Sequence, residues 1–356
     1  SDAALVSDGT LMICDVRNVA VLGYPPAMTS GSPLRHSTPA LETLLRLDAN
    51  GNILPCLAVA WQSNHEEKTI TLNLREGVTF HDGTPFHAEA VKWNLERQQA
   101  ANATGFSHLA SIEVAEEYTV ILHLTQWDNT LLPSLCQAQG LMISPDACQK
   151  NGVEWASTHP VGTGPFRFQN IASDGTISYL RYENYWQSGK PYLDEIKIVC
   201  DDDTSSREYR FREGRYNVLI RGDTASLSGF SAEGYQINAI TSTGPWGMVF
   251  DSAKSTSPFA DQRVRQAVCY AIDTDYIIHN IYLDTVTKTN QYATPGMYTY
   301  NSKVIGYEYN LSMARTLLRE AGYSEGFVTT YTYDQSADNA DALAHALQDM
   351  LAQVQI

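Results

Sequence analysis

The segment 69–86 reads TITLNLREGVTFHDGTPF and combines a strand pattern with a turn. Apolar and polar residues alternate over 69–74, which predicts a half-buried strand. The run Asp82-Gly83-Thr84-Pro85 predicts a turn, because glycine and proline interrupt regular structure. Apolar residues at helical spacing follow over 88–95. The sequence therefore predicts a strand, a turn and a helix at the centre of a small α+β unit.

Segments on either side extend this unit. Upstream, Leu41, Leu44 and Leu45 are spaced for one face of a helix, and the polar residues 48–52 predict a turn. Downstream, residues 120–124 alternate as a second strand. These elements, together with 69–95, predict one α+β subdomain.

The rest of the chain predicts more strands and then helices. Residues 160–165 are rich in glycine and proline, and three strand-like segments follow at 166–168, 177–182 and 195–199. An apolar strand-like segment at 11–13 opens the chain. Helical periodicity then predicts three helices, which span 261–272, 310–321 with Asn310 as N-cap and Gly322 as stop, and 343–354.

Composition limits the class of protein. A chain of 356 residues with 43% hydrophobic residues can bury two separate cores. The formal net charge of −16 disfavours nucleic acid as a partner, because phosphates would be repelled. No apolar run approaches the roughly 20 residues of a membrane-spanning helix. The six cysteines form no C-x-x-C pair, so most are predicted to be free thiols, with Cys136 and Cys148 as the first pair to check.

Several motifs resemble one family in order and spacing. Residues 51–61 resemble its pattern G-x-I-x-P-x-L-A-x-x-W, and 74–86 resemble LR-x-GV-x-FHDG-x-PF. Further matches are GTGPF at 162–166, ENYW at 183–186, KPYLDEI at 190–196, RVRQA at 263–267 and YAID at 270–273. The chain therefore resembles the oligopeptide, dipeptide and nickel-binding family of ABC-importer substrate-binding proteins, which is solute-binding protein family 5.

The resemblance implies a mixed α/β fold of the periplasmic-binding-protein type II, with two lobes that close on a ligand about a hinge. Lobe I would span 1–244, with a sheet subdomain (1–40 and 161–244) and an inserted α+β subdomain (41–160). Residues 245–356 would form part of lobe II, since members of the family continue past the position of Ile356. The expected hinge residues are Gly162, Gly164, Gly244 and Pro245.

The same resemblance indicates ligand-contacting residues. Trp246 follows the predicted lobe boundary, where an indole can stack on a ligand or pack within the hinge. Phe106 replaces a tryptophan of the nickel-binding members, and a core role is an equal alternative. Tyr24 and Met28 lie in a proline-rich loop after the first strand, which faces the cleft in this family.

Gln137 and Gln139 lie in a segment, 135–142, that also faces the cleft by resemblance. Nickel-binding members carry arginines here that grip the carboxylates of a chelate. This chain has no arginine in the segment, which weakens the nickel-chelate interpretation.

Three patterns that suggest other chemistry have simpler interpretations. His81 and His87 flank a turn and lack the H-E-x-x-H spacing of a zinc site. The run 162–165 lacks the lysine of a phosphate-binding loop, and the acidic run 201–204 lacks the ligand spacing of a calcium loop. No nucleophile, metal or cofactor motif indicates an enzyme.

The sequence thus predicts an extracytoplasmic, periplasmic or lipid-anchored, binding protein that delivers a small solute to a membrane ABC permease. A short peptide is the favoured ligand, and no cofactor is expected. Two alternatives stay open at this point: a nickel or metal-chelate binder of the same family, and a sensor or interaction protein that reuses the fold.

Overall fold

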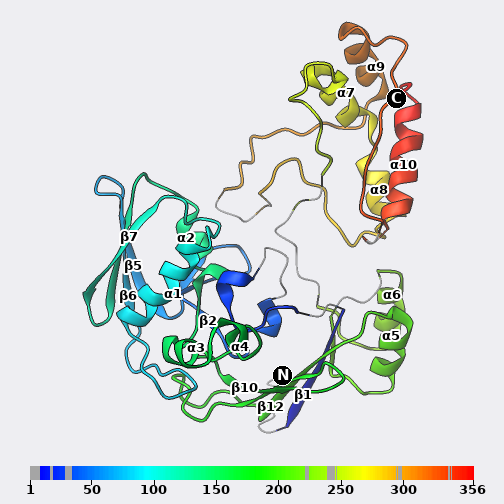
Figure 1. Ribbon diagram of the computed structural model, residues 1–356. Coiled ribbons are helices and arrows are strands. Elements are labelled where there is room, and N and C mark those ends of the chain that lie inside the picture. The colour runs from blue at the N-terminus through cyan, green and yellow to red at the C-terminus, as the bar shows by residue number, and fades with distance from the viewer. Residues whose placement is uncertain are drawn as a thin grey trace. The chain divides into compact units, whose positions relative to one another are not determined.

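The computed structural model describes residues 9–16, 19–28, 34–220, 224–238, 245, 247–293, 295, 299–335, 337 and 339–356 (Figure 1). The chain forms two compact units, Ser1–Gly222 and Asp223–Ile356. The predicted lobe boundary at 244 and 245 lies further along the chain, inside the second unit, and stays a prediction.

A five-stranded sheet forms one part of the first unit, with strand order β10-β11-β12-β1-β13. Its strands are β1 (Thr10–Asp15), β10 (Phe166–Ile171), β11 (Ile177–Arg181), β12 (Glu195–Cys200) and β13 (Val218–Leu219). β1 is parallel to both β12 and β13, whereas β11 is antiparallel to its neighbours. The chain therefore leaves this sheet after β1 and returns to it at β10, which confirms the predicted strands.

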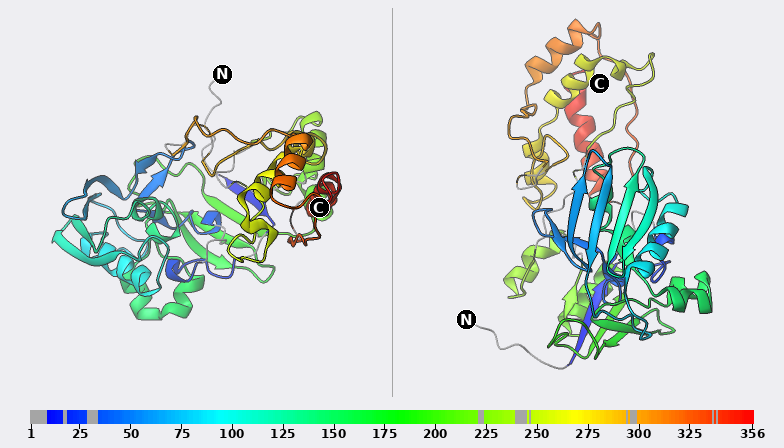
Figure 2. Two further views of the ribbon diagram at one scale, coloured as in Figure 1. Left: turned by 90° about the horizontal axis from the view of Figure 1, so that it is seen from above. Right: turned by 90° about the vertical axis from the view of Figure 1, so that its left-hand side faces the viewer.

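A four-stranded antiparallel sheet lies within the intervening sequence, with order β5-β6-β8-β7. Its strands are β5 (Ala58–Asn64), β6 (Thr69–Leu74), β7 (Leu109–Glu116) and β8 (Thr119–Leu124). The predicted alternation holds, because Ile70, Leu72 and Val120 are all fully buried. Helix α1 (Ala88–Ala100) contacts β7 and β8 and lies beside these strands (Figure 2).

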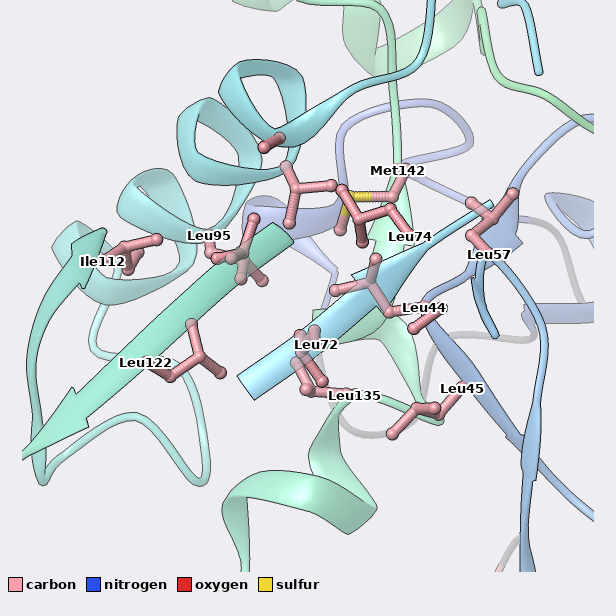
Figure 3. Close-up of a cluster of buried hydrophobic side chains, with 14 of the residues drawn as sticks. Leu44, Leu45, Leu57, Leu72, Leu74, Leu95, Ile112, Leu122, Leu135 and Met142 are labelled. Carbon is pink, nitrogen blue, oxygen red and sulfur yellow. The ribbon is translucent and has the colours of Figure 1, made fainter. Parts of the chain in front are cut away.

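Leucine side chains fill the core between this sheet and its neighbours (Figure 3). Leu72 and Leu122 from the strands, Leu95 from α1 and Leu44 and Leu135 from the flanking segments belong to one buried cluster. Burial of this many leucines at about 2 kcal/mol each supplies the main stabilisation of the subdomain.

The predicted helix at Leu41, Leu44 and Leu45 is wrong. This segment instead forms β2 (Glu42–Thr43), paired with β9 (Leu141–Met142), and β3 (Leu45–Leu47), paired with β4 (Ile53–Pro55). The backbone N–H of Leu44 donates to the carbonyl of Gly140, and that of Leu45 to the carbonyl of Leu135. Long-range pairing therefore overrides a local helical spacing of leucines.

Short helices lie between the strands of the first unit. They are η1 (Pro25–Ala27), η2 (Leu34–His36), α2 (Leu131–Ser134), η3 (Ala138–Gly140), α3 (Pro145–Asn151), α4 (Val153–Thr158) and α5 (Thr204–Arg212).

The described part of the second unit contains helices and no strand. These are α6 (Thr224–Ala232), η4 (Pro258–Ala260), α7 (Gln262–Ala271), α8 (Thr274–Asn280), α9 (Leu311–Glu320) and α10 (Ala340–Ala352). The caps explain where two helices begin, since Asp261 accepts a hydrogen bond from the N–H of Arg263 at 2.8 Å and Asn310 accepts one from that of Met313 at 3.0 Å. All three predicted helices of this region are confirmed.

The six cysteines are free thiols, and Cys136 and Cys148 are therefore not bonded to each other. Cys14 and Cys148 are buried, whereas the other four are partly exposed. Among the described residues, no helix has the length and apolarity needed to cross a membrane.

Candidate functional site

Three parallel strands of the first unit end at the same edge of its five-stranded sheet. β1 ends at Asp15, β12 at Cys200 and β13 at Leu219. In open α/β sheets, ligands bind outside the carboxyl ends of the parallel strands. We call this region the carboxyl edge, and it includes the described residues of the segment 16–36 that follows β1.

A buried carboxylate lies at the carboxyl edge. Asp15 is fully buried and accepts hydrogen bonds on both oxygens. Its Oδ1 accepts from Nη2 of Arg35 at 2.9 Å and from the backbone N–H of Val16 at 2.7 Å. Its Oδ2 accepts from Nε of Arg35 and contacts Nε2 of His36 at 2.8 Å. These partners satisfy the carboxylate, so Asp15 is held in one orientation.

The protein stabilises the ionised form of Asp15. Burial alone would raise the pKa of Asp15, but the hydrogen bonds from His36 and Arg35 and the positive charge of Arg35 outweigh it and hold the pKa well below its usual range. Asp15 is therefore an anion at neutral pH. The hydroxyl of Tyr179, itself fully buried, donates to the carbonyl of His36 and fixes the short helix η2.

Arg35 differs from its partners because its side chain reaches solvent. Its side-chain exposure is 38%, whereas Asp15 and His36 are fully buried. Nε and Nη2 both bind Asp15, which is a side-on paired geometry. Nη1 makes no hydrogen bond in the described part of the chain. Arg35 therefore presents a fixed guanidinium at the carboxyl edge, with one donor that no described residue uses.

The structure brings two predicted ligand-binding segments together. Tyr24 and Met28 flank η1, and η1 contacts η3, the helix that begins immediately after Gln137 and contains Gln139. Tyr24 and Met28 are partly buried against the cluster that also holds Leu34, the residue before Arg35. Burial raises the pKa of Tyr24, so its hydroxyl is neutral at physiological pH. Ligand contact by these residues stays a prediction.

Phe106 is placed elsewhere. It is 2% exposed and belongs to the core cluster of the four-stranded sheet. The alternative interpretation of Phe106 as a core residue agrees with this burial, since the side chain offers almost no surface to a ligand.

The predicted hinge residues fall in different places. Gly162 and Gly164 lie inside the first unit, where an added Cβ would come within 2.2 Å of the Ala40 carbonyl oxygen and 2.6 Å of the Pro39 carbonyl oxygen, respectively. Close backbone packing thus explains these glycines without a hinge. Pro245 is partly buried. Gly244 and Trp246 lie outside the described residues, so their roles stay predictions.

Three of the motifs that carry the family resemblance meet around a partly buried carboxylate. Glu42 accepts hydrogen bonds from Thr163 at 2.8 Å, from the Tyr185 hydroxyl at 2.8 Å and from Nε1 of Trp186 at 2.9 Å. The guanidinium of Arg75 lies 4.1 Å from the ring centre of Trp186. The motifs at 74–86, 162–166 and 183–186 therefore join the five-stranded and the four-stranded sheets of the first unit, which is a structural function.

His81 belongs to the same joint. Its Nε2 is 2.9 Å from the carbonyl oxygen of Gly164, and its ring packs edge-on against Tyr182. Burial lowers the pKa of His81 to about 4, although the hydrogen bond to Gly164 opposes this shift. The imidazole is therefore neutral near pH 7, in agreement with a structural turn.

Two aspartates of the acidic run at 201–204 also make structural contacts. Asp203 caps α5 by accepting from the N–H of Ser206, and Asp201 pairs with Arg210 at 3.0 Å. Within the described ranges, no group of three histidine, cysteine or acidic residues could hold a metal ion.

A hollow of about 330 Å³ lies between α1 and α3. Its lining includes Trp93, Lys92 and three acidic residues, Glu89, Glu96 and Asp146. None of the residues predicted to bind ligand lines it.

Sequence reasoning missed Asp15, Arg35 and His36. A polar residue directly after the apolar strand 11–14 was an available signal, because it had to lie at a strand end. The pairing partner was not readable, since Arg35 and His36 meet Asp15 only through the folded path of the segment between them.

Comparisons with known proteins agree with this architecture. Residues 52–356 match the family of bacterial extracellular solute-binding proteins, family 5. The glutathione-binding protein GsiB of Salmonella paratyphi A is 29% identical over 324 residues, which cover 88% of this chain and 62% of that protein. Heme-binding protein A of Haemophilus influenzae is 29% identical over 361 residues, covering 93% of this chain and 65% of that protein.

A solved structure shows the same fold. The periplasmic binding protein DppA of Helicobacter pylori, in complex with the peptide STSA, superposes with a TM-score of 0.76 and 25% identity over 98% of this chain and 72% of that one. The predicted mixed α/β fold of the periplasmic-binding-protein type is confirmed. The chain belongs to family 5 of the bacterial extracellular solute-binding proteins. It spans 62% of the length of the GsiB relatives it matches.

Proposed function

We propose that this chain is the substrate-binding component of an ABC importer, which acts outside the cytoplasm and passes a small solute to a membrane permease. The observation that carries this proposal is the family match over residues 52–356. The protein would bind its ligand reversibly and leave it chemically unchanged.

A short peptide is the proposed ligand. The similar proteins include one named for glutathione and one solved with the peptide STSA. The segment 135–142 lacks arginine, which disfavours a metal chelate held there through its carboxylates. The ligand would contact Tyr24, Met28, Gln137 and Gln139 from the first unit, and Trp246.

The test is a thermal-shift screen of the protein with di- to pentapeptides, nickel-histidine mixtures and heme. A ligand that binds only the folded state raises stability by about 2.7 kcal/mol at one hundred times its Kd. We expect a rise in Tm with at least one peptide. A rise with nickel-histidine or heme alone would replace the peptide by that ligand class, and no rise with any compound would contradict the proposal.

A variant pair tests the predicted site. Trp246→Ala should weaken binding of the active peptide and leave the Tm of the unliganded protein nearly unchanged. Trp127→Ala is the control, because Trp127 stacks on His65 with ring centres 3.7 Å apart in the subdomain of the four-stranded sheet. Unchanged affinity in Trp246→Ala would remove Trp246 from the site.

A further inference from the structure

The fold pairs Arg35 with Asp15 at the carboxyl edge, and the sequence alone does not predict this pairing. Arg35 follows β1 in the chain, and its Nε and Nη2 are both bound to Asp15, at the last position of that strand. This arrangement uses one side of the guanidinium for Asp15, and Nη1 has no acceptor within the described ranges, so it can donate to a ligand.

The residues behind Arg35 are buried and hydrogen-bonded to one another. Asp15 is fully buried, and its other contacts are with His36 and the backbone N–H of Val16. Tyr179 in turn holds the carbonyl of His36. A guanidinium that is fixed in advance loses little conformational entropy when it binds an anion, so it is well suited to select one.

The surroundings of Arg35 connect it to the predicted ligand-binding residues. Leu34, Tyr24 and Met28 pack on one hydrophobic cluster of the first unit. Arg35 directly follows Leu34, and 38% of its side chain is exposed. A carboxylate is the small-molecule anion that matches the fork of a guanidinium.

We infer that Arg35, positioned by the buried Asp15, binds a carboxylate of the ligand at the carboxyl edge. This inference rests on the proposed function and adds a specificity rule to it: the solute must carry a free carboxylate. Arg35 is the group that contacts ligand, and Asp15 is a positioning residue.

Another arginine of the first unit provides a matched control. Arg181 also pairs with an aspartate, Asp194, and its side chain is 26% exposed. It ends β11, and Asp194 directly precedes β12, so this pair lies at the opposite edge of the sheet. Removing Arg181 disrupts an arginine–aspartate pair without touching the carboxyl edge.

The test compares a peptide that binds the wild type with the same peptide amidated at its C-terminus and, for glutathione, with its diester. Affinities are measured by calorimetry for the wild type, Arg35→Gln and Arg181→Gln. Loss of a charged hydrogen bond predicts that the wild type favours the free acid about tenfold to a hundredfold. Arg35→Gln should lose this preference, and Arg181→Gln should keep it.

A buried aspartate without its arginine could prevent Arg35→Gln from folding. The double variant Asp15→Asn/Arg35→Gln removes both charges and carries the same prediction. If either folded variant still prefers the free acid as the wild type does, the inference is overturned while the proposed function stands. If the wild type binds no peptide at all, both the proposed function and this inference are contradicted.

Discussion

Nε1 of Trp186 donates a hydrogen bond to Oε2 of Glu42 at 2.9 Å across 144 residues of sequence. Thr163 and Tyr185 donate to the same carboxylate. Three of the family motifs therefore join the five-stranded and four-stranded sheets, and they indicate the fold more directly than the ligand.

Replacing Glu42 by glutamine tests this joint. Glutamine has one acceptor oxygen, so a donor among Thr163, Tyr185 and Trp186 would face an amide N–H. We expect a loss of about 1–3 kcal/mol in the free energy of unfolding, measured by urea denaturation. Glu113→Gln, which removes an exposed pairing with His123, is the control and should change stability little. Equal effects of the two substitutions would contradict the role of Glu42.

His81 predicts a pH dependence. Its pKa is lowered to about 4 in the folded chain, from 6.5 in the unfolded chain. Between these values the unfolded state binds a proton that the folded state refuses, so stability falls as pH decreases from about 6.5 to 4. The expected contribution is of the order of 3 kcal/mol.

The variant His81→Gln keeps a donor for the Gly164 carbonyl and removes the titration. Its stability relative to the wild type should be constant above pH 7 and should improve as the pH is lowered to 4. Asp15 affects stability only at lower pH. Its pKa is lowered in the folded chain, so the stabilisation it provides is lost only as pH falls below its unfolded-state pKa of 3.8. Parallel pH profiles for wild type and variant would exclude His81 as the source.

Gly162 should not tolerate a side chain. A Cβ there would lie 2.2 Å from the carbonyl oxygen of Ala40, so Gly162→Ala forces two backbone segments apart. We expect a loss of about 1–3 kcal/mol in thermal or urea unfolding. Gly247→Ala is the control, since a Cβ at Gly247 would meet no atom within 4 Å. A stability of Gly162→Ala equal to that of the wild type would be incompatible with this packing.

Because the cysteines are free thiols, we expect the stability of the protein not to depend on reductant. A disulfide that stabilised the fold would contribute about 2–5 kcal/mol, which a reducing agent would remove. We expect the same Tm with and without dithiothreitol, and six thiols titrated with a thiol reagent after denaturation without reduction. A lower Tm in reductant would show a bond that the structure lacks.

Much of the fold follows from the sequence because alternation and helical spacing report burial directly. The strands at 69–74 and 120–124 and the helices capped by Asp261 and Asn310 are examples. The segment at Leu41–Leu45 forms strands and not the predicted helix, because its partners, near Leu135 and Gly140, are distant in sequence. Local spacing carries no information about such pairing.

The candidate site was less accessible to prediction. Tyr24, Met28, Gln137 and Gln139 could be placed by resemblance, and the contact between η1 and η3 brings their segments together. Phe106 could not be distinguished from a core residue before its burial was known. Asp15 and Arg35 required the fold, since only the end of β1 places them side by side.

Calorimetric titration of the wild-type protein with a peptide selected by the thermal-shift screen tests the central claim most directly, followed by mass spectrometry of the recovered peptide. The account predicts saturable binding of one peptide per chain, with the peptide recovered intact. Heats that never saturate, or a peptide returned cleaved or modified, would contradict it.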